Sequence, residues 1–148
     1  MKKSAIVLSL ALSMSFAGVA SAQVTPEAKA MIDAQMNKAQ HITPAELKQA
    51  LDAKQNLVIL DIRQVSERPK AGLITANDVH IPRGYLEIKG FGMLPDKNAN
   101  IVVYCGKGVR SAFAANTLKE MGYTNVRNLK GGAFEWKQQG YTTLPVSE

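Results

Sequence analysis

Cysteine is almost absent from this chain, which has one, Cys105, in 148 residues. No disulfide can form within such a chain, and the two-cysteine Cys-x-x-Cys centre of thioredoxin-type proteins is excluded. Zinc sites built from several cysteines are excluded for the same reason. The two histidines, His41 and His80, have no obvious partner in the sequence, and we interpret both as non-catalytic. We therefore expect no metal and no cofactor.

Runs of basic residues are also missing, although the net charge is +6. The lysines and arginines are scattered and are not interleaved with aromatic side chains. Nucleic-acid binding usually needs a clustered basic face, so we expect no nucleic-acid partner. A small anionic substrate remains compatible with the charge.

Long apolar segments are missing except at the N-terminus. Ala5 to Val19 follows Lys2 and Lys3 and precedes the small-x-small pattern at 20–22. This pattern predicts a signal peptide over 1–22, cleaved before Gln23, and so a periplasmic protein. The alternative is an uncleaved membrane anchor, but the apolar core is shorter than the roughly 20 residues that span a bilayer. We expect no membrane association after cleavage.

An exported protein with a single cysteine is unusual, because oxidising compartments favour paired cysteines. The remaining thiol therefore indicates chemistry or pairing with another molecule. A chain of this length buries enough surface to fold without a disulfide or metal.

Apolar runs alternate with amphipathic segments over the rest of the chain. Thr43-Pro44-Ala45-Glu46 is typical of a capped helix start. We expect a helical extension over 23–42 and one domain over 43–148. Strands are predicted at 57–62, 79–81, 101–105 and 125–129, and helices at 26–40, 44–54, 84–89, 111–121 and 133–138. This order predicts an α/β fold, a parallel sheet with helices on both faces.

Cys105 falls at the carboxyl end of a predicted strand, where open α/β sheets bind ligands. The next residues, Gly106 to Arg110, supply two glycines and two cations before a helix begins near Ser111. Backbone N–H groups of the loop and helix start, with the charges of Lys107 and Arg110, favour a thiolate. The alternative is an inert core cysteine, but that role would need neither the glycines nor the cations.

Four segments in order along the chain resemble motifs of the rhodanese family, and the resemblance extends from Thr43 to Leu144. They are Asp61-Ile62-Arg63, His80-Ile81-Pro82-Arg83-Gly84, Val103-Tyr104-Cys105-Gly106-Lys107-Gly108-Val109-Arg110-Ser111, and Leu129-Lys130-Gly131-Gly132-Ala133-Phe134-Glu135-Trp136. One stretch departs from the family pattern: Gly72 to Asp78 lacks the usual Gly-His-Ile and Gly-Ala and is one residue longer. The local backbone there is therefore left open.

The resemblance implies a rhodanese-like fold and a thiosulfate sulfurtransferase. Cys105 would attack thiosulfate or a similar donor, carry a persulfide, and pass the sulfur to cyanide or a thiol. Arg110 and Lys107 would bind the anionic donor, and the backbone of Gly106, Gly108 and Val109 would stabilise the sulfur anions.

Several charged or aromatic residues near these motifs have less definite roles. Asp61 and Arg63 either shape the loop, pair with Arg110 or substrate, or form a structural ion pair beneath the site. Arg83 could reach the pocket mouth, although a solvated loop cation is the alternative. Trp136 is expected in the core, and a solvated surface run is expected from Glu67, Arg68 and Lys70.

Two other function classes remain open. Phosphatases and arsenate reductases on this fold need Cys-x5-Arg, whereas Arg110 closes the shorter Cys-x4-Arg. The shorter loop suits a sulfur atom better than a phosphoryl group. The second rival is a binding module, or a persulfide carrier that serves a dedicated partner with little turnover.

Overall fold

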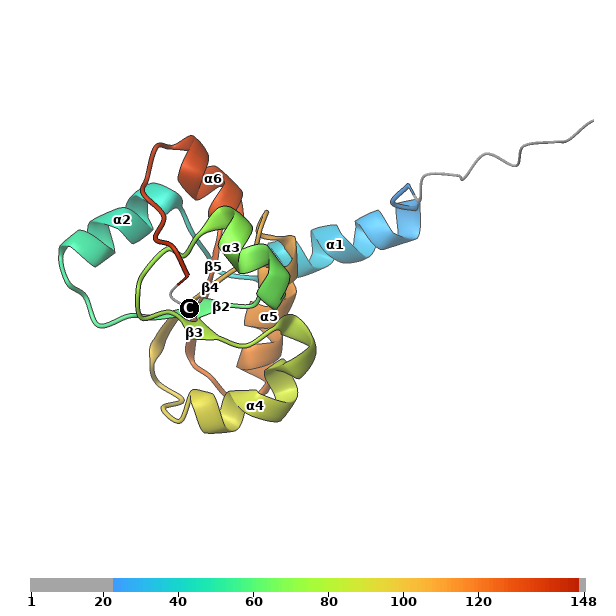
Figure 1. Ribbon diagram of the computed structural model, residues 1–148. Helices are drawn as coiled ribbons and strands as arrows, with labels where there is room; N and C mark the ends of the chain where they lie inside the picture. The colour runs from blue at the N-terminus through green and yellow to red at the C-terminus, as the bar shows by residue number, and fades with distance from the viewer. Residues whose placement is uncertain (1–22, 147–148) are drawn as a thin grey trace, which may run out of the picture.

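The computed structural model describes residues 23–146 and shows five parallel strands in one sheet (Figure 1). The strands are β1 (His41–Ile42), β2 (Val58–Asp61), β3 (Val79–His80), β4 (Asn100–Tyr104) and β5 (Asn125–Leu129). Their order across the sheet is β1-β5-β4-β2-β3, which places β4 at the centre. The expected parallel α/β architecture is confirmed. The predicted signal segment, 1–22, lies outside the described residues.

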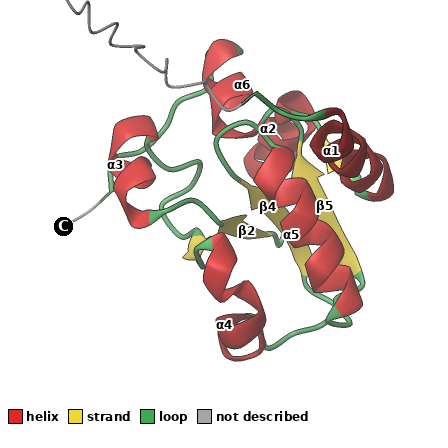
Figure 2. Cartoon of the chain, turned by 90° about the vertical axis from the view of Figure 1, so that its right-hand side faces the viewer, coloured by secondary structure: helices red, strands yellow, loops and turns green. Residues whose placement is uncertain are grey.

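Helices cover both faces of the sheet (Figure 2). They are α1 (Pro26–Lys38), α2 (Pro44–Asp52), α3 (Arg68–Ala71), α4 (Leu86–Met93), α5 (Val109–Glu120) and α6 (Gly132–Gln138), with 3₁₀ turns η1 (Val65–Glu67) and η2 (Arg83–Tyr85). Strand side chains alternate between two cores because the side-chain period of a strand is two. Ile101 and Val103 pack with α4 and α5, whereas Val102 and Tyr104 pack with α2 and α6.

The first strand is a feature that the sequence did not indicate. β1 has two residues, too few for a period-two pattern, and it pairs with Asn128 and Leu129 of β5. The predicted extension over 23–42 thus divides into a surface helix and an edge strand whose Ile42 is buried in the core.

The helix starts follow the capping chemistry of the sequence. The Thr43 hydroxyl accepts from the Glu46 N–H at 3.2 Å, and the Thr43 N–H donates to Glu46 Oε2 at 2.8 Å, which confirms the predicted capping box. α5 begins at Val109, two residues before the predicted start. The helix therefore starts within the cysteine loop. Within residues 23–146, the helices are all too short or too polar to cross a bilayer.

Candidate active site

The cysteine loop connects the end of β4 to the start of α5. Cys105 directly follows Tyr104, and the residue is only 1% exposed. Its Sγ accepts hydrogen bonds from the Gly108 N–H at 3.2 Å and the Ser111 hydroxyl at 3.3 Å. Gly108 has φ +88°, a left-handed conformation that glycine adopts without strain. Two donors therefore converge on the sulfur, one from the loop and one from the first turn of α5.

The first turn of α6 donates hydrogen bonds to the backbone of this loop. The Ala133 N–H donates to the Cys105 carbonyl and the Phe134 N–H to the Gly106 carbonyl, both at 2.9 Å. Gly132 permits the contact, because a Cβ there would lie 2.5 Å from the Cys105 carbonyl oxygen. With both carbonyls directed to α6, the N–H groups on the other side of these trans peptides point away from α6. The Gly-Gly turn thus orients the backbone of the cysteine loop.

A hollow of about 410 Å³ opens over Cys105 and gives the buried thiol its access. It is lined by Glu67, Cys105, Gly106, Lys107, Val109 and Arg110. The structure therefore brings together the cysteine, both loop cations and the loop backbone that the sequence singled out. Cys105 also belongs to the apolar core, so burial and access to a hollow occur together at this residue.

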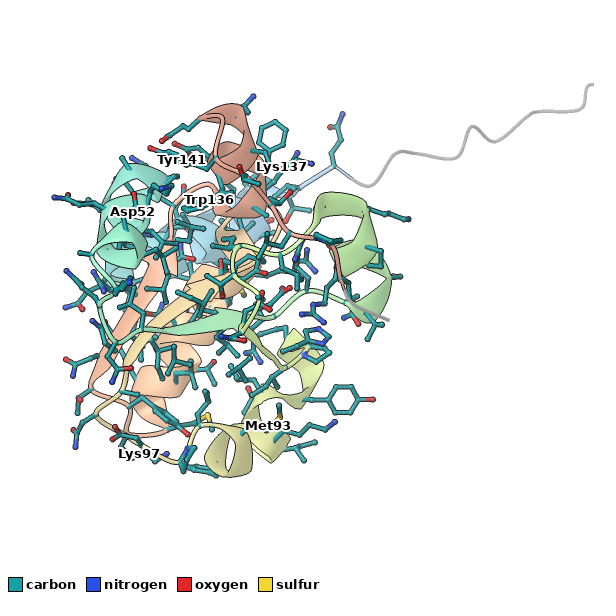
Figure 3. The ribbon with its side chains drawn as sticks, turned by 60° about the vertical axis from the view of Figure 1, so that its left-hand side comes forward. Asp52, Met93, Lys97, Trp136, Lys137 and Tyr141 are labelled. Carbon is teal, nitrogen blue, oxygen red and sulfur yellow. The ribbon has the colours of Figure 1, made fainter. Side chains whose placement is uncertain are left out.

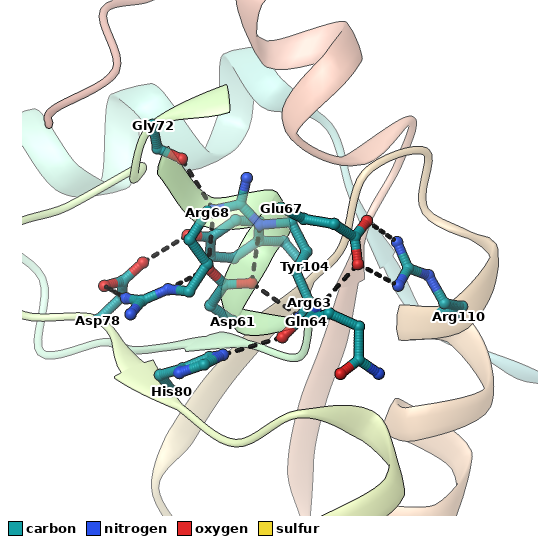
Figure 4. Close-up of polar contacts among 10 residues, drawn as sticks. All are labelled: Asp61, Arg63, Gln64, Glu67, Arg68, Gly72, Asp78, His80, Tyr104 and Arg110. Carbon is teal, nitrogen blue, oxygen red and sulfur yellow. Dashed lines mark hydrogen bonds and ion pairs between the residues drawn. The ribbon is translucent and has the colours of Figure 1, made fainter. Parts of the chain in front are cut away.

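Arg110 is bound by a carboxylate that the sequence did not assign to the site. Its Nη1 and Nη2 donate to Glu67 Oε2 and Oε1 at 2.8 and 2.6 Å (Figure 4). Hydrogen bonds from Arg110 lower the pKa of Glu67 to about 2. The predicted solvated surface run is wrong for Glu67. The sequence feature that could have indicated an ordered Glu67 is the capping box of η1, in which the Gln64 N–H donates to Glu67 Oε2 at 2.9 Å.

Asp61 and Arg63 form a buried ion pair beside Tyr104, the residue that precedes Cys105. Arg63 Nε donates to Asp61 Oδ1 at 2.9 Å and its Nη2 to Oδ2 at 2.7 Å, with side chains 1% and 0% exposed. Burial alone would raise the pKa of Asp61, but the Arg63 hydrogen bonds outweigh it and hold the pKa below its ordinary value. Neither residue bonds to Arg110, so this geometry favours the structural alternative.

The segment that departs from the family pattern completes this buried network. The Gly72 carbonyl accepts from Arg63 Nη2 at 2.8 Å, and Asp78 accepts from the Tyr104 hydroxyl (Figure 4). Arg68 donates to Asp61 at 3.0 Å and to Asp78 at 3.3 Å, so the solvated interpretation of Arg68 is also wrong. Burial raises the pKa of Asp78.

The remaining residues named from the sequence have structural contacts away from the hollow. Arg83 donates to Glu87 at 3.0 Å and to Thr117 at 3.1 Å, so it neither lines the hollow nor stays a free loop cation. Trp136 is 2% exposed, as expected of a core residue, and the centre of its ring lies 4.8 Å from the centre of the Tyr141 ring (Figure 3).

Both histidines bond to backbone carbonyls, His41 to that of Met36 at 2.8 Å and His80 to that of Arg63 at 2.9 Å. Over residues 23–146, no three His, Cys, Asp or Glu side chains are grouped as metal ligands.

Comparisons with known proteins show the family and the fold of this chain. The family model described as "Rhodanese-like domain" matches residues 43–139. A sulfurtransferase of Allochromatium vinosum is 30% identical over 105 residues, which are 71% of this chain and 92% of that protein. The first curated relatives are longer proteins, and the chain spans 46% and 26% of their lengths.

Solved structures with the same fold carry different descriptions. The polysulfide-sulfur transferase homodimer of Wolinella succinogenes is 27% identical, with a TM-score of 0.69 over 81% of this chain and 88% of that one. A protein of unknown function from Rhodopseudomonas palustris, described as a possible tyrosine phosphatase, is 28% identical, with a TM-score of 0.68 over 78% and 92%.

Proposed function

The chain belongs to the rhodanese-like domain family, and we propose that it moves sulfane sulfur from thiosulfate, or a similar anionic donor, to cyanide or a thiol through a Cys105 persulfide. One observation carries the proposal. The Cys105 sulfur receives two hydrogen bonds at the base of a hollow that Lys107 and Arg110 also line. A sulfur nucleophile, donors for a sulfur anion and cations for an anionic donor are therefore in one place.

The reaction balances without a cofactor. The Cys105 thiolate attacks the outer sulfur of thiosulfate, the S–S bond of thiosulfate breaks, and sulfite leaves with the bonding electrons. The enzyme then holds a Cys105–S–S⁻ anion, which the Gly108 N–H and Ser111 hydroxyl can stabilise as they do the thiolate. Cyanide attacks the outer sulfur, thiocyanate leaves, and the Cys105 thiolate is restored.

The size of the loop supports sulfur over phosphate chemistry. Arg110 is the fifth residue after Cys105, which leaves one residue fewer than the loop of the phosphatases on this fold. An aryl phosphate assay on purified protein tests this point, since turnover that depends on Cys105 would contradict our proposal.

Intact mass spectrometry tests sulfur transfer directly. Reduced protein treated with thiosulfate should gain one sulfur atom, and cyanide should remove it as thiocyanate. Cys105→Ser should remain folded and gain no sulfur, while Ser111→Ala should load less persulfide because it removes one donor to the sulfur. Unmodified mass in the reduced wild-type protein would end the proposal.

A persulfide carrier for a dedicated partner is the second candidate. It is favoured by the 1% exposure of Cys105 and by the ion pair that already occupies Arg110. A carrier would load sulfur from thiosulfate but retain it in the presence of cyanide and small thiols. The rate of discharge in the mass experiment separates the two candidates.

We propose that the protein works after export to the periplasm, on the basis of the apolar and small-residue pattern over 1–22. Fractionation of cells that produce the full chain tests this. The periplasmic form should begin at Gln23, and retention of the full-length chain in the membrane would contradict cleavage.

A further inference from the structure

A second hollow, of about 340 Å³, lies beside the catalytic one. Its apolar surface comes from Ala71 at the end of α3 and from Ala133 and Phe134 at the start of α6. Phe134 is 54% exposed, although it is the most apolar side chain of this surface. Figures 1 and 2 both show α3 and α6 at the same end of the molecule, opposite α4. The hollow is thus a small apolar surface open to solvent.

Three lysines surround this apolar surface. Lys70, Lys107 and Lys137 all line the hollow, and Lys107 Nζ lies 5.8 Å from the centre of the Phe134 ring. Lys137 projects from α6 (Figure 3). Within residues 23–146 these lysines form no salt bridge, whereas the other charged lining residues, Arg63 and Glu67, are each paired. The unpaired charge of the hollow is therefore positive.

The two hollows share a wall. Glu67, Gly106 and Lys107 line both, and Gly106 is the residue directly after Cys105. A molecule in the second hollow therefore has one end beside the cysteine. A volume near 340 Å³ suits a small organic molecule. It falls at the lower end of the volumes of ordinary ligand pockets.

We propose that this hollow binds the sulfur acceptor, and that the acceptor is a small thiol carrying carboxylate groups. Its aliphatic part would contact Ala71 and Phe134, and its carboxylates would meet the three lysines. Its sulfur would lie at the wall formed by Gly106 and Lys107. This inference rests on the proposed function, because it requires a persulfide on Cys105.

The transfer step is balanced for such a thiol. The acceptor thiol R–SH attacks the outer sulfur of the Cys105–S–S⁻ persulfide and gives its proton to that sulfur, a new S–S bond forms, and the bond between Cys105 Sγ and the outer sulfur breaks. Cys105 leaves as a thiolate, and the acceptor leaves as R–S–SH with the proton of its own thiol group. No oxidant or reductant is consumed.

The test compares two acceptors of similar size, mercaptosuccinate, which has two carboxylates, and neutral 1-thioglycerol. Wild-type protein should discharge its persulfide more efficiently to mercaptosuccinate. In Lys70→Glu/Lys137→Glu the efficiency ratio of the two thiols should fall roughly tenfold, since attraction becomes repulsion at two positions. Lys89→Glu, a control on the distant α4, should leave the ratio unchanged. An unchanged ratio in the double variant would overturn the proposal.

Binding of an unreactive analogue provides a readout that does not depend on turnover. Titration with (methylthio)succinate should shift the amide NMR signals of Ala133 and Phe134 in wild-type protein and not in the double variant. Absence of these shifts, in protein that loads sulfur from thiosulfate, would overturn the acceptor hollow and leave the proposed function intact. Protein that never loads sulfur would overturn the proposed function itself, whatever the titration shows.

Discussion

At the scale of single residues, the catalytic hollow contains a carboxylate beside its arginine. In the proposed reaction, a dianionic donor must approach Arg110 while Glu67 already neutralises its charge. Both side chains are partly exposed, at 42% and 37%, so water screens the pair and an anion can compete for the guanidinium. We therefore propose that Glu67 sets how strongly the site attracts an anionic sulfur donor.

Glu67→Gln should improve donor binding. The amide removes the competing charge, so the thiosulfate concentration needed for half-maximal loading of Cys105 should fall roughly two- to fivefold. Arg110→Lys should raise that concentration, because lysine lacks the fork that matches an oxyanion. Loading is followed by intact mass. A higher donor requirement in Glu67→Gln would instead mean that Glu67 holds Arg110 in its productive position.

The stability of the protein in acid should also depend on the Glu67–Arg110 pair. The pKa of Glu67 falls from 4.5 to about 2 because of its hydrogen bonds with Arg110, so folding favours the charged carboxylate. The pair's contribution to the free energy of unfolding is complete above about pH 4.5 and is lost as the pH falls toward 2. Solvent screening keeps it below about 1 kcal/mol. Melting temperatures from pH 5 to 2.5 should fall slightly less in Glu67→Gln than in wild type; a parallel fall would contradict this.

The buried pair of Asp61 and Arg63 should behave differently. Asp61→Asn leaves the Arg63 charge buried without its carboxylate, which should cost about 3–5 kcal/mol of unfolding free energy. Asp52→Asn breaks the exposed pair with Lys48 and should cost less than about 1 kcal/mol. Urea denaturation measures both. Equal losses would show that the buried pair contributes no more than a surface pair.

At the scale of elements, the contact between α6 and the cysteine loop determines the shape of the site. The first turn of α6 binds the carbonyls of Cys105 and Gly106, and its Gly132 has φ +59°. The Leu-x-Gly-Gly motif therefore helps to shape the candidate active site, although neither of its glycines lines the hollow over Cys105.

Gly132→Ala should damage both stability and sulfur loading. A Cβ would strain a left-handed backbone and lie 2.5 Å from the Cys105 carbonyl, so we expect a loss of about 2–4 kcal/mol. Gly122→Ala is the matched control. It has φ +94° and no neighbour within 4 Å, so it should cost about 1 kcal/mol of backbone strain alone. Denaturation and persulfide loading check both variants, and normal loading in Gly132→Ala would show that α6 does not hold the loop.

At the scale of the whole molecule, the sequence predicted those strands and loops that short residue patterns encode. The apolar runs predicted four of the five described strands, β2 to β5, and the residues around Cys105 predicted the loop and its cations. Contacts across long sequence separations were missed: Glu67 meets Arg110 43 residues later, and Asp78 meets Tyr104 26 residues later. Such pairs depend on strand order and loop paths, which local periodicity does not specify.

The arrangement of α1 predicts that the catalytic domain functions without it. None of its residues is buried, and it contacts the second half of α5 through Gln35 to Asn116 and Lys38 to Glu120. The cysteine loop joins the opposite end of α5. A chain that begins at Gln40 keeps the backbone hydrogen bond from Asn128 to the Gln40 carbonyl and so retains β1.

Removal of 23–39 should therefore lower stability and preserve sulfur transfer. The truncation exposes Asn116, which is 2% exposed in the full structure, and removes the surface contacts of α1. We expect the free energy of unfolding to fall by about 1–2 kcal/mol and the Tm by roughly 3–8 °C. Loading of Cys105 should stay within about twofold of wild type, since no group that contacts the sulfur is removed. Tm and intact mass after thiosulfate treatment measure the two effects separately. A folded shortened chain that cannot load sulfur would place α1 in the transfer reaction.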